Sequence, residues 1–185
     1  MGLENALQQA FNLITFPDEA LITSCDLCTE LDLALIKTAH KPMFHIMKAY
    51  GGLGLAANQV GISKRFFVLK TNSTAPGPGK VEDTVVIINP VVLDISEEVC
   101  TELEGCLSLP LFSENITRPN EITLQFKNEN WGDTTAVFSG VEARCIQHEL
   151  GHLNGRLVLD ELSLMKQDMY KKKLYKNRKH GKISL

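Results

Sequence analysis

The sequence predicts an α+β fold, in which antiparallel or mixed strands pack around a central helix that carries a His-Glu-x-x-His motif, with a further helix at the C-terminus. Short runs of β-branched and aromatic residues predict the strands, and apolar residues at helical spacing predict the helices. Strands and helices do not alternate regularly, which argues against a parallel sheet. A length of 185 residues fits one domain.

The first half of the chain predicts one helix and two strands. Apolar residues recur at helical spacing over residues 31–50, where Pro42 should kink the helix. Residues 65–69 and 84–92 are rich in β-branched and aromatic side chains and predict strands. The segment 71–80 is rich in Ser, Thr, Pro and Gly and predicts an exposed loop.

The second half predicts a hairpin, a central helix and a C-terminal helix. Residues 121–127 and 134–138 flank a polar turn and predict the hairpin. The central helix begins at a Ser-Gly-Val-Glu capping box, Ser139 to Glu142, and Gly155 supplies its stop. A last amphipathic helix is expected over about residues 160–176, where apolar residues stand among the charges: Leu162, Leu164, Met165, Met169 and Leu174.

The central helix contains His148-Glu149-Leu150-Gly151-His152. Histidines four residues apart project from one helix face and can bind one metal ion. Glu149, beside the first histidine, can act as a general base toward water at such a site. The alternative interpretation is two core histidines and a surface glutamate.

A catalytic metal site needs a third protein ligand. Asp160 and Glu161 follow the end of the helix too closely to be favoured. Cys106 lies at the end of a predicted strand, and Cys145 lies three residues before His148 on the same helix face, so spacing does not separate the two cysteines. A thiolate from a separate strand can approach a tetrahedral site more easily, which favours Cys106.

A segment of small residues, 52–59, points to the same site. Its G-x-G-x-x-A pattern matches a dinucleotide fingerprint, but a helix rather than a strand precedes it, so nucleotide binding is not favoured. Small residues allow the backbone to approach an extended ligand closely. The side-chain amide of Gln59 can stabilise a developing oxyanion.

Together these segments resemble the peptide deformylase family. Its motifs G-x-G-x-A-A-x-Q, E-G-C-x-S and Q-H-E-x-D-H match residues 52–59, 104–108 and 147–152, in that order. The resemblance covers most of residues 1–165, which we expect to form a single catalytic domain. It implies a metal-dependent hydrolase that removes the N-formyl group from the initiator methionine of nascent polypeptides and releases formate.

The resemblance also implies a role for each matching residue. Glu149 would be the acid/base, and Gln59 with the backbone N–H of Leu107 would stabilise the oxyanion. The implied metal ligands are Cys106, His148 and His152. The implied substrate-binding residues are Leu53, Gly54, Gly105, Val141 and Cys145. The metal would be Fe²⁺, with Zn²⁺, Ni²⁺ or Co²⁺ as alternatives that suit a His₂Cys donor set.

One position departs from the family motif, because Gly151 stands where the family has Asp. That Asp is not a ligand, so metal binding and proton transfer should be kept. Arg118, its expected partner, would then need another acceptor. A homologue that has lost activity is therefore one alternative, and an endopeptidase with the same His-Glu-His site is another. A zinc-stabilised or thiol-redox module, suggested by Cys25 and Cys28, lacks a second cysteine pair.

The charge of the chain is unevenly distributed. The net charge is −3, yet residues 166–185, the expected basic C-terminal helix or tail, contain eight Lys and Arg and one Asp. The charge of this segment suggests a polyanionic partner, with a solvated helix end as the alternative, and the resemblance implies that the partner is ribosomal RNA. No apolar run is long enough to span a membrane, no signal peptide is recognisable, and the cysteines do not suggest a disulfide framework. We therefore expect a cytoplasmic protein with neither a membrane nor DNA as partner.

Overall fold

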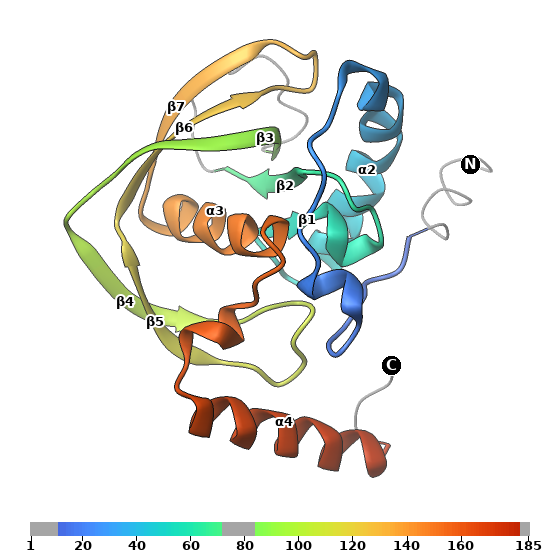
Figure 1. Ribbon diagram of the computed structural model, residues 1–185, viewed down its shortest axis with the longest axis vertical. Helices are drawn as coiled ribbons and strands as arrows, with labels where there is room; N and C mark the ends of the chain where they lie inside the picture. Colours follow the sequence, from blue (N-terminus) through green and yellow to red (C-terminus); the bar gives the residue numbers. More distant parts are fainter. Residues whose placement is uncertain (1–10, 72–83, 182–185) are drawn as a thin grey trace.

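A single helix lies at the centre of the fold, between two antiparallel sheets (Figure 1). The structure is a computed structural model that describes residues 11–71 and 84–181. The five-stranded sheet has the order β1 (Gly54–Ala56), β2 (Phe66–Lys70), β3 (Thr84–Ile95), β6 (Glu121–Lys127) and β7 (Asp133–Ser139). The two-stranded sheet consists of β4 (Val99–Glu104) and β5 (Glu114–Pro119). The helices are α2 (Leu33–Ala49), α3 (Gly140–Leu153) and α4 (Leu164–Lys179), and the 3₁₀ helices are η1 (Glu19–Ile22), η2 (Glu30–Asp32), η3 (Ala57–Val60) and η4 (Val158–Glu161).

The predicted α+β class is confirmed, since every strand pair in both sheets is antiparallel. The two predicted strands in the first half correspond to β2 and β3, and the predicted hairpin to β6 and β7. β3 extends to Ile95, three residues beyond the prediction. The predicted loop at 71–80 lies, apart from Thr71, outside the described residues.

Helix α2 covers one side of β1 and β2. Its buried side chains recur at intervals of three and four residues, which is the spacing of one helix face: Ile36, Ala39, Met43 and Met47. Pro42 lies inside the continuous helix, so the predicted helix is confirmed over Leu33–Ala49. Among the described residues, no helix is both long and apolar enough to cross a membrane.

The two ends of α3 form differently from one another. Ser139 is the N-cap residue as predicted, but the capping box is wrong, because the Ser139 side chain makes no capping hydrogen bond. Ser139 is still paired in β7, and Gly140 turns the chain into the helix with φ +56°. At the other end Gly155, with φ +66°, donates to the carbonyl of His152, and the N–H of Arg156 donates to that of Gly151. These two bonds form a Schellman motif, so the predicted stop is confirmed.

Helix α4 begins later than the sequence predicts. Residues 160 and 161 belong to η4, and α4 starts after Ser163, whose hydroxyl accepts a long hydrogen bond of 3.5 Å from the N–H of Lys166. Asp160 instead accepts a 2.8 Å hydrogen bond from the N–H of Leu157 and so stabilises the preceding turn.

The apolar face predicted for the C-terminal helix is also wrong in part. Three of its five residues are largely exposed, with exposed fractions of 79%, 71% and 63%: Leu164, Met165 and Met169. The buried side chains of α4 are Tyr170 and Leu174, since these two pack in one cluster with Leu109 and Phe112 from the loop between β4 and β5.

Candidate metal centre

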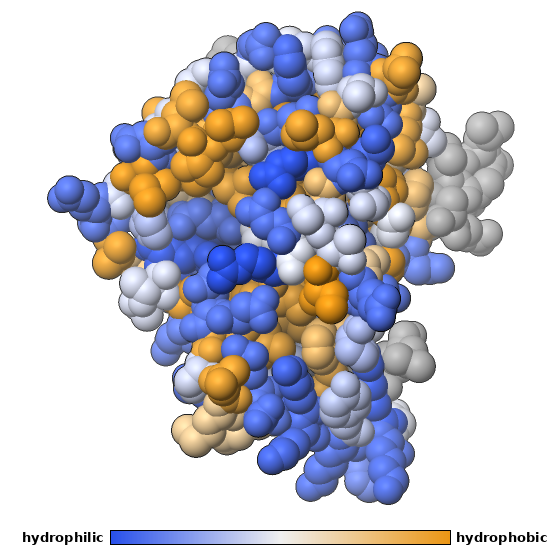
Figure 2. Space-filling view, viewed as in Figure 1, coloured by the Kyte–Doolittle hydropathy of each residue, from blue (hydrophilic) through white to orange (hydrophobic). Residues whose placement is uncertain are grey.

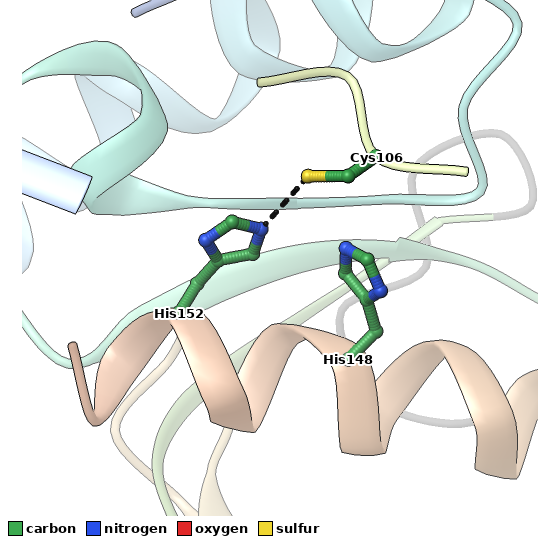
Figure 3. Close-up of side chains that lie close together, drawn as sticks. All are labelled: Cys106, His148 and His152. Carbon is green, nitrogen blue, oxygen red and sulfur yellow. Dashed lines mark hydrogen bonds between the residues drawn. The ribbon is translucent and has the colours of Figure 1, made fainter. Parts of the chain in front are cut away.

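Three potential metal ligands converge on one point of the structure. His148 and His152 project from the same face of α3, and Cys106 faces them from the loop that follows β4 (Figure 3). Their ligand atoms all lie within 4.8 Å of one another. The sequence prediction that favoured Cys106 over Cys145 therefore agrees with the geometry, because Cys106 is the cysteine that joins the histidines.

The distances and the donor types fit a divalent metal ion. Cys106 Sγ lies 3.3 Å from His152 Nε2, and a tetrahedral ion with ordinary metal–sulfur and metal–nitrogen distances would separate two such ligands by about 3.5 Å. Burial lowers the pKa of His148, but the neighbouring Cys106 and Glu104 raise it to about 10 overall. The surroundings of His148 therefore favour a positive charge, which a metal ion supplies when it replaces the proton.

A buried carboxylate orients the first histidine. Glu104 Oε2 lies 3.3 Å from His148 Nδ1, and Glu104 also accepts hydrogen bonds of 2.6 and 2.9 Å from Arg118. Burial alone would raise the pKa of Glu104, but hydrogen bonds from His148, Arg118 and Arg144 lower it to about 2. The ionised carboxylate accepts from His148 Nδ1–H, so Nε2 is left to face a metal ion.

Arg144 belongs to this network and was not among the site residues predicted from sequence. Its guanidinium donates to Glu104 at 2.6 Å and to the carbonyl oxygens of Ile116 at 2.8 Å and Cys100 at 2.7 Å. Arg144 lies four residues before His148 on the same face of α3, which is the signal that could have identified it.

The predicted need of Arg118 for another acceptor is met by the same carboxylate. Arg118 binds Glu104 through two nitrogens. A β-carbon at Gly151 would lie 3.5 Å from the carbonyl oxygen of Arg156, which is ordinary contact. The glycine at this position is therefore not required by close packing.

Glu149 is buried in the site with an unusual proton affinity. Burial raises the pKa of Glu149 to about 7, although the nearby His148 lowers it. Its Oε2 is buried and has no hydrogen-bond partner among the described residues. A carboxyl group with a pKa near neutrality and one free oxygen can exchange a proton with a bound ligand or water.

Gln59 lies beside Cys106, where η3 follows β1. Its Oε1 accepts from the N–H of Ala56 at 2.8 Å, and its Nε2 donates to Ser108 Oγ at 3.0 Å and lies 4.0 Å from Cys106 Sγ. The N–H of Leu107, one residue after Cys106, makes no hydrogen bond within the described part of the chain. The Leu107 N–H is therefore available near the ligand cluster, and Gln59 Nε2 faces the same cluster through its contact with Cys106 Sγ.

The ligand cluster opens into a cleft of about 610 Å³. All five predicted substrate-binding residues line this cleft: Leu53, Gly54, Gly105, Val141 and Cys145. A β-carbon at Gly54 would lie 2.5 Å from Glu149 Oε1 and 2.6 Å from Cys145 Sγ, so a larger residue does not fit there. Gly105 has no comparable restriction, since its nearest atom would be 3.7 Å away.

Cys25 and Cys28 behave as core residues. Cys25 and Cys28 are buried and free, and burial raises the pKa of each thiol to about 11. A thiol with such a pKa is unreactive at neutral pH. The thiol-redox alternative therefore finds no support at these two positions.

Known proteins resemble this chain in sequence and in fold. A family model described as polypeptide deformylase matches residues 10–168. The peptide deformylase of Wolbachia pipientis wMel is 41% identical over 172 residues, which cover 91% of this chain and 96% of that protein. The crystal structure of peptide deformylase from Ehrlichia chaffeensis matches with a TM-score of 0.81 at 35% identity, covering 94% of this chain and 99% of that one. A second structure of that protein, in complex with actinonin, matches with a TM-score of 0.80 at 36% identity, covering 90% of this chain and 96% of that one.

Proposed function

The chain belongs to the polypeptide deformylase family, and we propose that the cleft lined by Cys106, His148 and Glu149 is where its reaction takes place. The protein is an amide hydrolase that removes the N-formyl group from nascent polypeptides. The observation that supports the proposed site most directly is the convergence of one thiol and two imidazoles beside a buried carboxyl group in a cleft.

Cys106, His148 and His152 would hold one divalent metal ion. We expect Fe²⁺ in the cell, and the same His₂Cys donor set also suits Zn²⁺, Ni²⁺ or Co²⁺. When bound, the ion supplies Lewis-acid chemistry, since it polarises a carbonyl group and makes a water molecule more acidic. Glu104 fixes the orientation of His148 toward it.

Glu149 would move the protons of the reaction. Its carboxylate accepts a proton from the water that attacks the formyl carbon, which a pKa of about 7 allows near neutral pH. Gln59 Nε2 and the Leu107 N–H would donate hydrogen bonds to the formyl oxygen as it becomes negative. The carbon–nitrogen bond then breaks, and Glu149 returns the proton to the departing amine. The products are formate and a free N-terminus.

The peptide would lie along the cleft. Gly54 and Gly105 would offer backbone hydrogen bonds to an extended chain, and Leu53, Val141 and Cys145 would line the pocket for the methionine side chain. Both glycines lack a side chain that would keep the peptide away from the backbone. The lack of a side chain matters more at Gly54, because a β-carbon at that position would overlap Glu149.

The test of this proposal is the Glu149→Ala variant, purified without oxygen and analysed for metal before assay. Formate release from formyl-Met-Ala-Ser should fall by at least about a hundredfold with the metal content unchanged, since general acid–base catalysis alone contributes about 10²–10⁴-fold. Glu161→Ala, which removes an exposed carboxylate beyond the end of α3, is the matched control and should keep full activity. Metal-loaded Glu149→Ala protein with near-normal formate release would refute the assigned role.

We further propose that α4 brings the enzyme to the ribosome in the cytoplasm. Hydrophilic side chains gather over most of α4 (Figure 2), and its exposed basic residues include Lys172, Lys176 and Lys179. Phosphates of ribosomal RNA would attract this surface, and the attraction would weaken as salt concentration rises.

Replacing Lys172, Lys176 and Lys179 together by Gln tests the ribosome contact. Affinity for ribosomes should fall. The slope of log affinity against log salt concentration should also decrease, by the equivalent of about three phosphate contacts. The control is a triple replacement of three exposed lysines of α2: Lys37, Lys41 and Lys48. Equal losses in both triple variants would mean that net charge alone is responsible, and no loss in either would refute the contact.

A further inference from the structure

One face of α4 is attached to the segment that follows the metal-ligand loop. Lys166 Nζ forms an ion pair with Glu114 at 2.8 Å, and Tyr170 Oη donates to the carbonyl oxygen of Pro110 at 3.2 Å. Lys173 Nζ lies 3.5 Å from the carbonyl oxygen of Leu111, a longer and weaker contact. Positions 166, 170 and 173 are four and three residues apart, so they share one helix face.

Apolar contacts accompany these polar ones. The rings of Tyr170 and Phe112 meet edge to face with centroids 5.6 Å apart. Both residues are buried in a cluster that includes Leu109 and Leu174, and the metal-ligand residue Cys106 packs against it. The helix therefore shares a hydrophobic core with the loop that carries Cys106.

The attached segment forms a turn in an unfavourable conformation. The N–H of Phe112 donates to the carbonyl of Leu109 at 3.1 Å, with Pro110 at the second position and Leu111 at the third. Leu111 has φ +65°. This arrangement is typical of a type II turn, whose third position favours Gly because other residues are strained at positive φ. A leucine keeps such a conformation only where its surroundings hold it.

The same turn forms part of the wall of the catalytic cleft. All four of its residues line the cleft: Leu109, Pro110, Leu111 and Phe112. The turn begins three residues after Cys106, and the N–H of Leu109 donates to the carbonyl of Cys106 at 3.0 Å. A shift of the turn would therefore change the space available to a peptide while leaving the ligand residues of α3 in place.

We propose that Tyr170 is a positioning residue for substrate binding: from α4 it holds the strained Pro110–Leu111 turn in the conformation that forms the cleft wall. This inference rests on the proposed function, because it takes the cleft to be the binding place of the formylated peptide. The C-terminal helix thus contributes to the affinity of the enzyme for peptides through the turn, since Tyr170 itself is not among the residues that line the cleft.

The experiment is steady-state kinetics of the metal-loaded, full-length Tyr170→Phe variant with formyl-Met-Ala-Ser. The substitution keeps the ring that packs on Phe112 and removes only the hydroxyl that binds Pro110. We expect KM to rise about fivefold, the effect of one lost hydrogen bond, with kcat and metal content unchanged. Tyr175→Phe is the matched control, since Tyr175 is 51% exposed on the same helix and makes no hydrogen bond within the described residues.

A second measurement tests whether the turn transmits the effect. Glycine adopts positive φ without strain, so in a Leu111→Gly background the turn needs less support from α4. Adding Tyr170→Phe to that background should raise KM by less than twofold. A full fivefold rise in both backgrounds would overturn the role of the strained turn.

The remaining outcomes separate this inference from the proposed function. An unchanged KM in Tyr170→Phe, or a lower kcat accompanied by loss of metal, overturns the inference while Glu149→Ala remains inactive. Formate release that survives in Glu149→Ala would refute the proposed site itself, and the inference with it.

Discussion

Helices α3 and α4 are nearly equal in length, at 14 and 16 residues, but they are used in opposite ways. Eight residues of α3 are buried, and only two residues of α4. α3 lies between the two sheets, whereas α4 lies at one end of the molecule (Figure 1). Strands of both sheets pack against α3, whereas α4 presents one narrow face to the rest of the protein.

This difference decides where a substitution should have consequences. Around α3, several polar groups are buried with specific partners, such as Glu104 with Arg118 and Arg144. On α4, most of the charged groups face water, where ion pairs contribute little to stability. We therefore expect large effects from small changes around α3 and small effects from most changes on α4.

The largest effect should come from adding a single methyl group against α3. In Gly54→Ala the new carbon would lie 2.5 Å from Glu149 Oε1 and 2.6 Å from Cys145 Sγ, so β1 or Glu149 must move. We expect kcat/KM for formate release to fall by at least about a hundredfold, which corresponds to about 3 kcal/mol of lost transition-state stabilisation. Activity within about threefold of the parent enzyme would show that the packing around α3 is looser than the structure indicates.

The next effect should come from removing one buried charge. Glu104→Gln leaves Arg118 and Arg144 without their buried counterion, which we expect to lower the free energy of unfolding by about 3 kcal/mol. It also removes the acceptor for His148 Nδ1–H and should weaken metal binding by about 10- to 100-fold. Glu102→Gln is the control: this half-exposed partner of Arg144 should cost less than about 1 kcal/mol.

The same carboxylate predicts a pH dependence of stability. The pKa of Glu104 is lowered to about 2 in the folded protein from an ordinary value of 4.5. A lowered pKa means that the stabilisation is fully present above pH 4.5 and is lost as the pH falls toward 2. Denaturant unfolding of the parent and of Glu104→Gln should therefore give a stability difference that shrinks over this range. A difference that stays constant would contradict the ionised state of Glu104.

A smaller effect should come from the interior of α3 itself. At Gly151 a β-carbon meets only ordinary contacts, and glycine inside a helix is less favourable than alanine by about 1 kcal/mol. Gly151→Ala should therefore raise the free energy of unfolding by about 0.5–1 kcal/mol without loss of formate release. A destabilised variant would show that the space beside Gly151 is already filled.

The two helices also differ in how well their sequences predict them. In α3, the spacing of His148 and His152 and the stop at Gly155 are local features, so the sequence identifies them directly. The partners of Arg144 come from β4 and β5, and such long-range pairing leaves no periodic pattern in the sequence. The order of the strands in the sheet is hidden for the same reason, since β3 pairs with β6 although β4 and β5 lie between them in the sequence.

In α4 the apolar residues do not identify the buried face. Leu164 and Met165 suggest one stripe, while Tyr170 and Leu174 belong to another that is mostly framed by lysines. The second stripe is buried because the turn at 109–112 lies against it. The sequence of the helix itself does not predict that contact.

The smallest effect should come from the stripe that the sequence favoured. Leu164→Ala removes a side chain that is 79% exposed, so the free energy of unfolding should change by less than about 0.5 kcal/mol. Leu174→Ala, the matched change at a fully buried position, should cost about 2–5 kcal/mol. If the two substitutions cost the same, α4 would be rotated about its axis relative to this structure. Tyr170 could then not reach Pro110, and the attachment of α4 to the cleft wall would fail together with the contrast between the two helices.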